Sequence, residues 1–185
     1  MYQSFNRLEP VYHELAGKTW GIVGLGNIGR QVARVAQAMG CRVIAYTRTP
    51  REGFECVSLD TLCREADVIS LHTPLTEATR HLIGREQLTM MKRGAVLINV
   101  ARGAVTDEAG VAEAVLAEKI LFGCDVYARE PFAPDHPYAQ LLDREGVCLT
   151  PHMAWGSYEA RQRCVCEIAE NIAAFFAGQS RNRIV

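Results

Sequence analysis

Three observations predict an α/β fold built on a doubly wound parallel sheet. Short apolar segments alternate with helix-like segments from Lys18 to Thr150, and a glycine-rich turn separates the first strand-like segment from the first helix-like one. Of the 185 residues, 49% are apolar and 22% are charged, which is typical of a globular chain with one substantial core. Parallel strands need right-handed crossover connections, so this alternation favours one sheet with helices on both faces.

Each expected element follows from its local pattern. The strands are short apolar runs, at 19–23, 42–46, 67–71, 95–100, 120–126 and 147–150. The helices have apolar residues at helical spacing, at 28–39, 59–65, 85–91, 106–118 and 157–177. Gly40 is a stop signal for the first helix, and Asp107 and Glu108 place negative charge where the dipole of the fourth helix favours it. Segment 127–141 carries three prolines, and we expect a loop there with no element of its own.

The glycine-rich turn, Gly24–Gly29, matches G-x-G-x-x-G between a strand and a helix. The first glycine permits the tight turn, the second leaves room for a pyrophosphate, and the third lets the helix pack closely on the strand. Backbone N–H groups at the start of the helix then face the phosphates. In this context the motif predicts a dinucleotide-binding domain of the Rossmann type.

The end of the second expected strand differs from that of a typical NAD site. Thr47 stands where a carboxylate would accept hydrogen bonds from the ribose hydroxyls. Arg48 and Arg51, with the hydroxyls of Thr47 and Thr49, offer positive charge and donors suited to a 2′-phosphate. The prediction is therefore that NADP is favoured over NAD. The alternative is that Arg48 stacks on the adenine and the site accepts NAD without a strong preference.

Three chemically useful side chains follow the fourth, fifth and sixth expected strands: Arg102, Glu130 and His152. The carboxyl ends of parallel strands meet at one edge of a doubly wound sheet, where ligands bind. A guanidinium, a carboxylate and an imidazole brought to that edge are suited to reducing a 2-oxo acid. Taken singly, each has a plainer interpretation, since a lone Arg is usually a surface residue and a lone His a structural one.

Several longer stretches carry a resemblance to a known family. GLGNIG, LHTPLTEATRHLI, NVARGAVTDE, CDVYAREP and TPHMAWGS occur in this order along the chain. With them the sequence, from about Leu15 to its C-terminus, resembles the D-isomer-specific 2-hydroxyacid dehydrogenases. The stretch TPHMAWGSYEARQR is most similar to the glycerate dehydrogenase and hydroxypyruvate or glyoxylate reductase branch. The resemblance implies an NAD(P)-dependent oxidoreductase that acts on the CH–OH group of a small D-2-hydroxy acid.

The resemblance also implies a role for each matching residue. Arg102 would bind the substrate carboxylate and carbonyl, and His152 would be the acid/base that protonates the carbonyl oxygen. Glu130 would hydrogen-bond His152 and favour its protonated form, since a nearby carboxylate raises a histidine pKa. Asp125 would be the partner of the nicotinamide end. The expected cofactor-binding residues are Gly24, Gly26, Asn27, Ile28, Gly29, Thr47, Arg48, Thr49, Thr73, Pro74, Val100, Ala101 and Asp125.

The remaining histidines and the cysteines have plainer expectations. His72, at a strand end before Thr73, is expected to shape the cofactor loop rather than to do chemistry. His13, His81 and His136 are expected in surface or capping roles. The cysteines are odd in number and scattered, so we expect buried, reduced thiols with no disulfide and no metal site.

Members of the family have a second, substrate domain formed mostly upstream of the glycine turn. We expect residues 1–17 to be a remnant of the linker from that domain, 18–155 to be the dinucleotide-binding domain, and 156–185 to be a C-terminal helix that returns to the substrate domain. With the substrate domain largely absent, we expect cofactor binding but little or no turnover by this chain alone. The uncovered apolar face, including Phe175 and Phe176, favours self-association or a homodimer. The sequence leaves open whether the shortening is natural or engineered.

Composition argues against several classes of partner. The formal net charge is −1 and no basic cluster stands out, so we expect no nucleic acid partner. No apolar run has the length of a bilayer span and the N-terminus does not resemble a signal peptide, so we expect a cytoplasmic protein with no membrane partner. One alternative of a different class stays open, a cofactor-sensing binding module of the corepressor type without turnover. A structural domain with no ligand is hard to reconcile with Arg102, Glu130 and His152 together.

Overall fold

The computed structural model describes residues 11–184, so the part of the linker expectation that concerns residues 1–10 lies outside the described residues. The chain forms two compact units, Met1–Leu149 and Thr150–Val185, and each is described by itself. Among the described residues, none of the helices combines the length and the apolar character that a membrane span requires.

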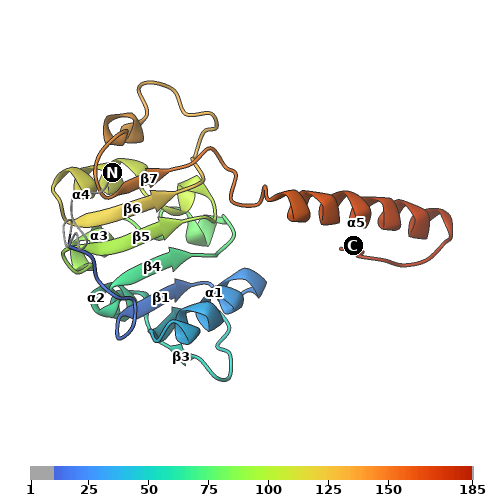
Figure 1. Cartoon of the computed structure of the whole chain (residues 1–185), viewed down its shortest axis with the longest axis horizontal. Coiled ribbons are helices and arrows are strands. Elements are labelled where there is room, and N and C mark those ends of the chain that lie inside the picture. The colour runs from blue at the N-terminus through green and yellow to red at the C-terminus, as the bar shows by residue number, and fades with distance from the viewer. Residues whose placement is uncertain (1–10, 185) are drawn as a thin grey trace, which may run out of the picture. The chain divides into compact units, whose positions relative to one another are not determined.

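The first unit is built on a seven-stranded sheet in which each neighbouring pair is parallel (Figure 1). The strands are β1 (Thr19–Val23), β2 (Arg42–Tyr46), β3 (Glu55–Cys56), β4 (Val68–Leu71), β5 (Ala95–Asn99), β6 (Ile120–Cys124) and β7 (Val147–Leu149). Their order is β3-β2-β1-β4-β5-β6-β7. β2 and β3 therefore lie on one side of β1, and β4 to β7 lie on its other side. The register places Gly21 of β1 between Ile44 of β2 and Ile69 of β4. The predicted doubly wound parallel sheet is confirmed.

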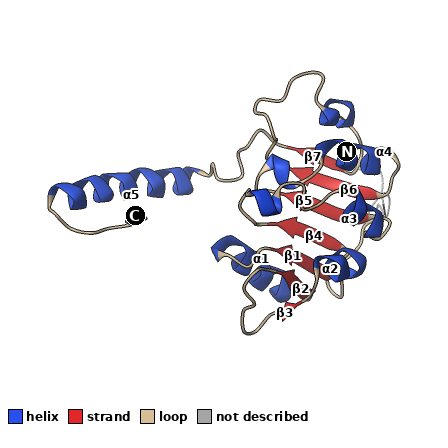
Figure 2. Cartoon of the chain, turned by 180° about the vertical axis from the view of Figure 1, so that it is seen from behind, coloured by secondary structure: helices blue, strands red, loops and turns tan. Residues whose placement is uncertain are grey.

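Helices cover both faces of this sheet (Figure 2). They are α1 (Asn27–Ala38), α2 (Leu59–Glu65), α3 (Arg85–Met90) and α4 (Glu108–Leu116), with short 3-10 helices η1 (Glu77–Thr79), η2 (Gly103–Val105) and η3 (Pro137–Leu141). Successive residues of β1 face opposite sides of the sheet. Ile22 belongs to the buried cluster that contains Ala33 of α1, and Val23 to the one that contains Leu62 of α2.

Two expectations about local structure are wrong. Glu55–Cys56 forms β3, which pairs with β2 and is too short for a period-two pattern to show in the sequence. Segment 127–141 has an element of its own, because η3 ends it. Tyr138 and Leu141 of η3 are fully buried, and the Tyr138 ring lies 5.0 Å from that of Phe122 in β6. The proline-bearing segment therefore contributes to the core.

The cysteines divide into two groups. Three are buried, Cys41, Cys63 and Cys124, whereas Cys56, Cys148, Cys164 and Cys166 are exposed, so the expectation of burial is wrong for these four. All seven are free thiols. Burial raises the pKa of both Cys63 and Cys124 to about 12, which keeps these two protonated and unreactive.

The second unit is a helix with short flanking segments. α5 (Tyr158–Phe176) begins after Ser157, whose hydroxyl accepts a hydrogen bond from the Ala160 amide at 3.3 Å. Near its C-terminal end, the Arg181 guanidinium donates to Glu167 at 2.8 Å and pairs with Glu170. Large apolar side chains are exposed along the helix, at Val165, Ile168, Ile172, Phe175 and Phe176.

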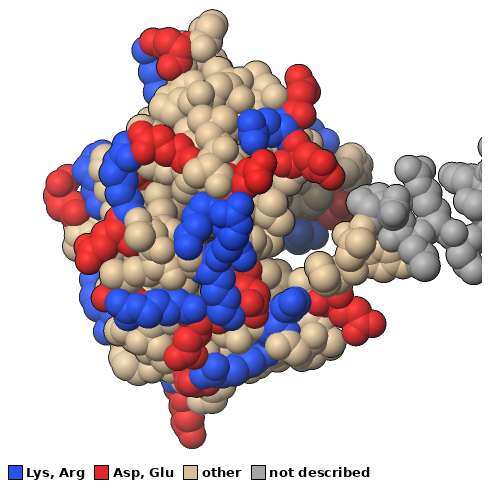
Figure 3. Space-filling model, turned by 90° about the vertical axis from the view of Figure 1, so that its left-hand side faces the viewer, with Lys and Arg blue, Asp and Glu red and all other residues tan. Residues whose placement is uncertain are grey.

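Charges of both signs are mixed over the surface of the first unit. On the face shown in Figure 3, basic and acidic side chains lie side by side. Several charged residues of the unit form ion pairs between elements, such as Arg42 with Glu55 and Lys92 with Asp67. Exposed pairs of this kind contribute at most about 1 kcal/mol each, so they tune the surface rather than hold the fold.

Candidate functional site

The candidate site lies where the strand order reverses, between β1 and β4. In doubly wound sheets the carboxyl ends of the strands on either side of such a point form a crevice that binds ligands. Gly24 follows β1 and His72 follows β4. Gly24 has a φ of +98°, and a Cβ added to it would lie 2.9 Å from the His72 carbonyl oxygen. The backbone of the glycine turn thus packs directly on the end of β4.

The other two glycines of the turn have different surroundings. A Cβ on Gly29 would lie 1.9 Å from the Gly24 carbonyl oxygen, so only glycine allows α1 to start this close to β1. Gly26 has open space on its Cβ side and caps α1 without a side-chain hydrogen bond. The open side and the uncapped N–H groups fit a phosphate approaching the start of α1. Beside the turn, the Asn27 side-chain oxygen accepts from Arg30 at 2.7 Å.

The loop after β2 presents hydroxyls and a guanidinium. Thr47 is the residue directly after β2 and is half-buried, and its hydroxyl donates to the Thr49 carbonyl at 3.3 Å. Arg48 is exposed, and in the described part of the chain neither Arg48 nor Arg51 forms an ion pair with a carboxylate. This loop can therefore offer positive charge to an anion.

A short chain of polar side chains joins β1 to the end of β4. The Trp20 indole N–H donates to the Ser70 hydroxyl at 2.9 Å, and that hydroxyl is 3.0 Å from His72 Nε2. Burial lowers the pKa of His72 to about 4, and its Nδ1 is buried without a hydrogen-bond partner. His72 is therefore a neutral group, and its backbone, on which Gly24 packs, fits a role in shaping the loop.

The loops that carry Arg102 and Glu130 touch through their backbones. A Cβ added to Gly103 would lie 2.0 Å from the Tyr127 carbonyl carbon, so only glycine permits this contact. The Asn99 side chain holds the first loop. Its NH₂ group donates to the Arg102 carbonyl at 3.0 Å, and its oxygen accepts from the Ala101 backbone N–H at 3.1 Å. In the second loop, the Glu130 carboxylate accepts from the Tyr127 amide at 2.9 Å.

The remaining predicted cofactor residues of the first unit lie at the ends of β4, β5 and β6. Thr73 and Pro74 follow His72. Val100 is 39% exposed, whereas Ala101 is buried. Asp125 is buried as well, and its amide donates to the Asn99 carbonyl at 3.1 Å. The structure thus gathers these residues at the same edge as Gly24.

His152 belongs to the second unit. It has a φ of +53°, a left-handed conformation that is uncommon for a residue other than glycine. Its carbonyl accepts from the Trp155 indole N–H at 3.0 Å, and its amide donates to the Thr150 carbonyl at 3.1 Å. This local network holds the His152 backbone in its strained conformation.

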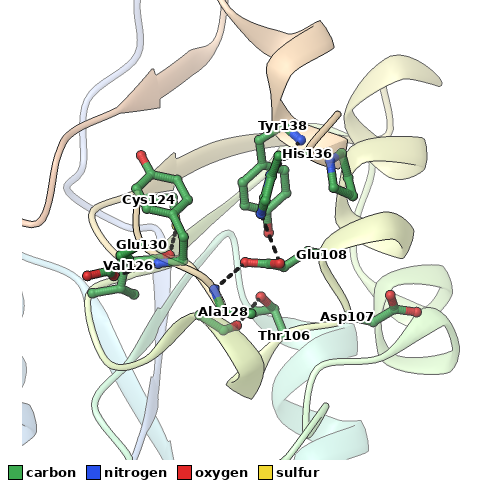
Figure 4. A network of polar contacts seen from close by, with 12 residues as sticks. Thr106, Asp107, Glu108, Cys124, Val126, Ala128, Glu130, His136 and Tyr138 are labelled. Atoms are coloured by element: carbon green, nitrogen blue, oxygen red, sulfur yellow. Dashed lines mark hydrogen bonds and ion pairs between the residues drawn. The ribbon is translucent and has the colours of Figure 1, made fainter. Parts of the chain in front are cut away.

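Two residues with a buried polar contact were not identified from the sequence. Glu108, at the start of α4, accepts from the Ala128 amide at 2.8 Å, and its other oxygen is 3.0 Å from His136 Nε2 (Figure 4). His136 caps η3, one of the two roles expected for it, since its Nδ1 accepts from the Tyr138 amide, and its side chain is only 8% exposed. The sequence offered only an acidic helix start and a His-Pro pair as signals.

Comparison with known proteins decides the family. Residues 2–154 match the family model described as D-isomer specific 2-hydroxyacid dehydrogenase, NAD binding domain. The chain belongs to this family.

In the part of the chain that the structure describes, no group of three or more His, Cys, Asp or Glu side chains could hold a metal ion.

Individual 2-hydroxyacid dehydrogenase relatives align with most of the chain. It is 44% identical over 174 residues to a glyoxylate reductase of Korarchaeum cryptofilum, covering 90% of this chain and 52% of the relative. It is 42% identical to a glycerate dehydrogenase of Methylorubrum extorquens, covering 94% and 54%. The crystal structure of D-lactate dehydrogenase from Aquifex aeolicus, complexed with NAD and lactic acid, superposes with a TM-score of 0.84 at 35% identity, covering 90% and 55%. The chain thus spans about half the length of these relatives.

Proposed function

We propose that the chain is the cofactor-binding part of an NAD(P)-dependent oxidoreductase that interconverts a small 2-oxo acid and its D-2-hydroxy acid. The observation that carries this proposal is the backbone contact between the loops of Arg102 and Glu130, at the edge of the sheet that also holds the glycine turn. The names of the relatives, glyoxylate reductase and glycerate dehydrogenase, support glyoxylate or hydroxypyruvate as the substrate. They also favour an enzyme over a cofactor-sensing module.

In this proposal three side chains share the chemistry at the substrate. Arg102 is exposed and offers paired N–H donors, which match a carboxylate in a planar, bidentate arrangement. His152 gives a proton to the carbonyl oxygen during reduction, and Glu130 orients it. The bound cofactor supplies the hydride. A general acid of this kind contributes about 10²–10⁴-fold to the rate.

We also propose which segments of the chain bind the cofactor and which contact the substrate domain. Residues 18–155 bind the cofactor, with Gly26, Asn27 and Ile28 at the pyrophosphate and Asp125 at the nicotinamide. Thr73, Pro74, Val100 and Ala101 line the cofactor. Residues 156–185 contact a substrate domain, and residues 1–17 belong to the linker toward it. Little turnover is expected from this chain alone, because domain closure excludes water from the reaction.

We propose in addition that NADP is favoured over NAD. The support is the loop after β2, where Thr47 replaces a carboxylate and Arg48 is exposed without an ion-pair partner among residues 11–184. A carboxylate at Thr47 would repel a 2′-phosphate, whereas the guanidinium can donate to it. The D-lactate dehydrogenase of Aquifex aeolicus is complexed with NAD, so one relative accepts the other cofactor.

A calorimetric titration of the chain with NADPH and with NADH tests both proposals about the cofactor. One hydrogen bond to a charged group contributes about 1.5–3 kcal/mol, so we expect NADPH to bind at least about tenfold more tightly. Arg48→Ala should remove that difference, and Arg93→Ala, which deletes a charge at the opposite edge of the sheet, should leave it unchanged. Equal or tighter binding of NADH would contradict the NADP preference. Binding of neither would contradict cofactor binding by this chain.

The reaction itself is tested by joining the chain to the upstream part of a glyoxylate reductase relative. Consumption of NADPH with glyoxylate and hydroxypyruvate would be followed by absorbance. A folded, cofactor-binding chimera without consumption of either substrate would contradict the proposed activity.

A further inference from the structure

The segment that carries Glu130 is anchored at two points. The Glu130 carboxylate accepts from the Tyr127 amide at 2.9 Å, which closes the turn on itself. The next amide, that of Ala128, donates to Glu108 of α4 at 2.8 Å. Adjacent backbone N–H groups therefore bind two different carboxylates, one within the turn and one outside it.

The external carboxylate of Glu108 is itself held by a histidine. Its second oxygen lies 3.0 Å from His136 Nε2, and the two side chains are only 14% and 8% exposed. We refer to these two residues as the Glu108–His136 pair. Figure 4 shows Glu108 between the Ala128 amide on one side and the His136 ring on the other.

The hydrogen bonds assign the tautomer of His136. Its Nδ1 accepts from the Tyr138 amide at 3.1 Å, and a backbone amide can only donate. Nδ1 therefore carries no proton. The ring proton lies on Nε2, and the Nε2–H group donates a hydrogen bond to Glu108. The ring is also enclosed by aromatic neighbours, with centroids 5.0 Å away at Tyr138, 4.8 Å at Phe132 and 5.9 Å at Tyr127.

We propose that the Glu108–His136 pair is a positioning device that holds the Glu130 turn against the Arg102 loop. The importance of this position rests on the proposed function, since it assumes that Glu130 and Arg102 act on one substrate. Glu108 must accept from two donors at once, and a carboxylate can do so with its two oxygens. The enclosed imidazole keeps the carboxylate from turning away.

Glu108→Gln tests this requirement with almost no change of shape. A glutamine has one acceptor oxygen, so it can satisfy the Ala128 amide or the His136 Nε2–H but not both. Hydrogen exchange by NMR should be at least about tenfold faster at the amides of Ala128 and Tyr127, or the ¹⁵N shifts of the His136 ring should show a changed tautomer. Amides of β5 should keep their protection. Glu113→Gln, on the exposed face of the same helix, should change neither signal.

A second variant keeps the proposal testable if Glu108→Gln folds poorly. In His136→Asn the side-chain oxygen can still accept from the Tyr138 amide and cap η3, but the donor to Glu108 is lost. We expect faster exchange at Ala128 and Tyr127 with η3 intact. Unchanged hydrogen exchange in both variants would overturn the proposal, as would faster exchange at the Ala128 amide without faster exchange at the Tyr127 amide. A His136 ring protonated at Nδ1 in the wild-type protein would also overturn it. These signals need no cofactor, so failure of the proposed function in the titration is a separate result.

Discussion

Two loops at the same edge of the sheet are built in opposite ways. The turn after β1 takes its shape from missing side chains, because the Gly24 and Gly29 backbones approach neighbours that no Cβ could approach. The segment after β6 is held instead by added side chains, the Glu108 carboxylate and the His136 ring. The first loop leaves open space at Gly26, and the second holds the Glu130 carboxylate on the Tyr127 amide of its own turn.

The difference corresponds to what each loop is proposed to hold. A phosphate is bound by backbone N–H groups, so glycines that expose the backbone serve it well. A catalytic carboxylate must keep a fixed direction, and polar side chains with complete hydrogen bonds provide that. Substitutions in the two loops should therefore fail for different reasons.

The largest effect is expected for Gly29→Ala. Alanine gains at most about 1 kcal/mol over glycine in a helix, but its Cβ would lie 1.9 Å from the Gly24 carbonyl oxygen. Overpacking costs about 1–3 kcal/mol, and the cost is higher when the atom in the way belongs to the backbone. The clash therefore outweighs the gain in helix propensity. Thermal unfolding followed by circular dichroism should show a clearly lower Tm.

Gly26→Ala is the matched control for this clash. Its Cβ would enter open space, so the Tm should stay within error while the affinity for NADPH falls at least about tenfold. An unchanged Tm in Gly29→Ala would show that the turn does not depend on the missing side chain.

An intermediate effect is expected from His72, the residue that follows β4. Burial lowers the pKa of His72 to about 4 from an ordinary value of 6.5, so between these values the unfolded chain binds more protons than the folded one. The free energy of unfolding should therefore fall as the pH drops through this window, by at most about 1.4 kcal/mol per pH unit from this group. Urea unfolding at several pH values gives the free energy of unfolding as a function of pH. This free energy should change less steeply with pH in His72→Gln than in wild type. Equal slopes in the two proteins would mean that His72 is not held neutral.

The smallest effect is expected at the opposite edge of the sheet, at Asp67. Burial raises its pKa, but the Lys92 ammonium at 2.8 Å and the Thr19 amide at 2.8 Å outweigh this and lower the pKa below its ordinary 3.8. Its contribution is therefore present above pH 3.8 and disappears as the pH falls through the lowered value. Asp67→Asn should unfold more easily at pH 7, by less than about 1 kcal/mol, and like wild type in acid.

Cofactor affinity is the control for Asp67. The residue precedes β4 at the amino edge, so NADPH binding should be the same in Asp67→Asn and wild type. A change in affinity would show that the carboxyl edge is not independent of the amino edge.

Most elements of the sheet could be predicted because their patterns are local. The runs at β1, β2 and α2 have the predicted bounds, since strand and helix periods appear within a few residues. The two-residue β3 could not be predicted, because its pairing with β2 comes from the sheet. The 3-10 helix η3 was also missed, because its prolines suggested a loop while the burial of Tyr138 depends on distant Phe122.

By itself the sequence determined the doubly wound fold, the glycine turn and the order of Arg102 and Glu130 along the chain, since each depends on neighbours in sequence. Only the tertiary structure decided that the Arg102 loop rests on the Glu130 loop through Gly103, and that Glu108 and His136 hold the latter. Glu108 meets partners 20 and 28 residues away. The physical reason is that a buried hydrogen bond depends on which donors the fold brings to an acceptor, and no local period records that.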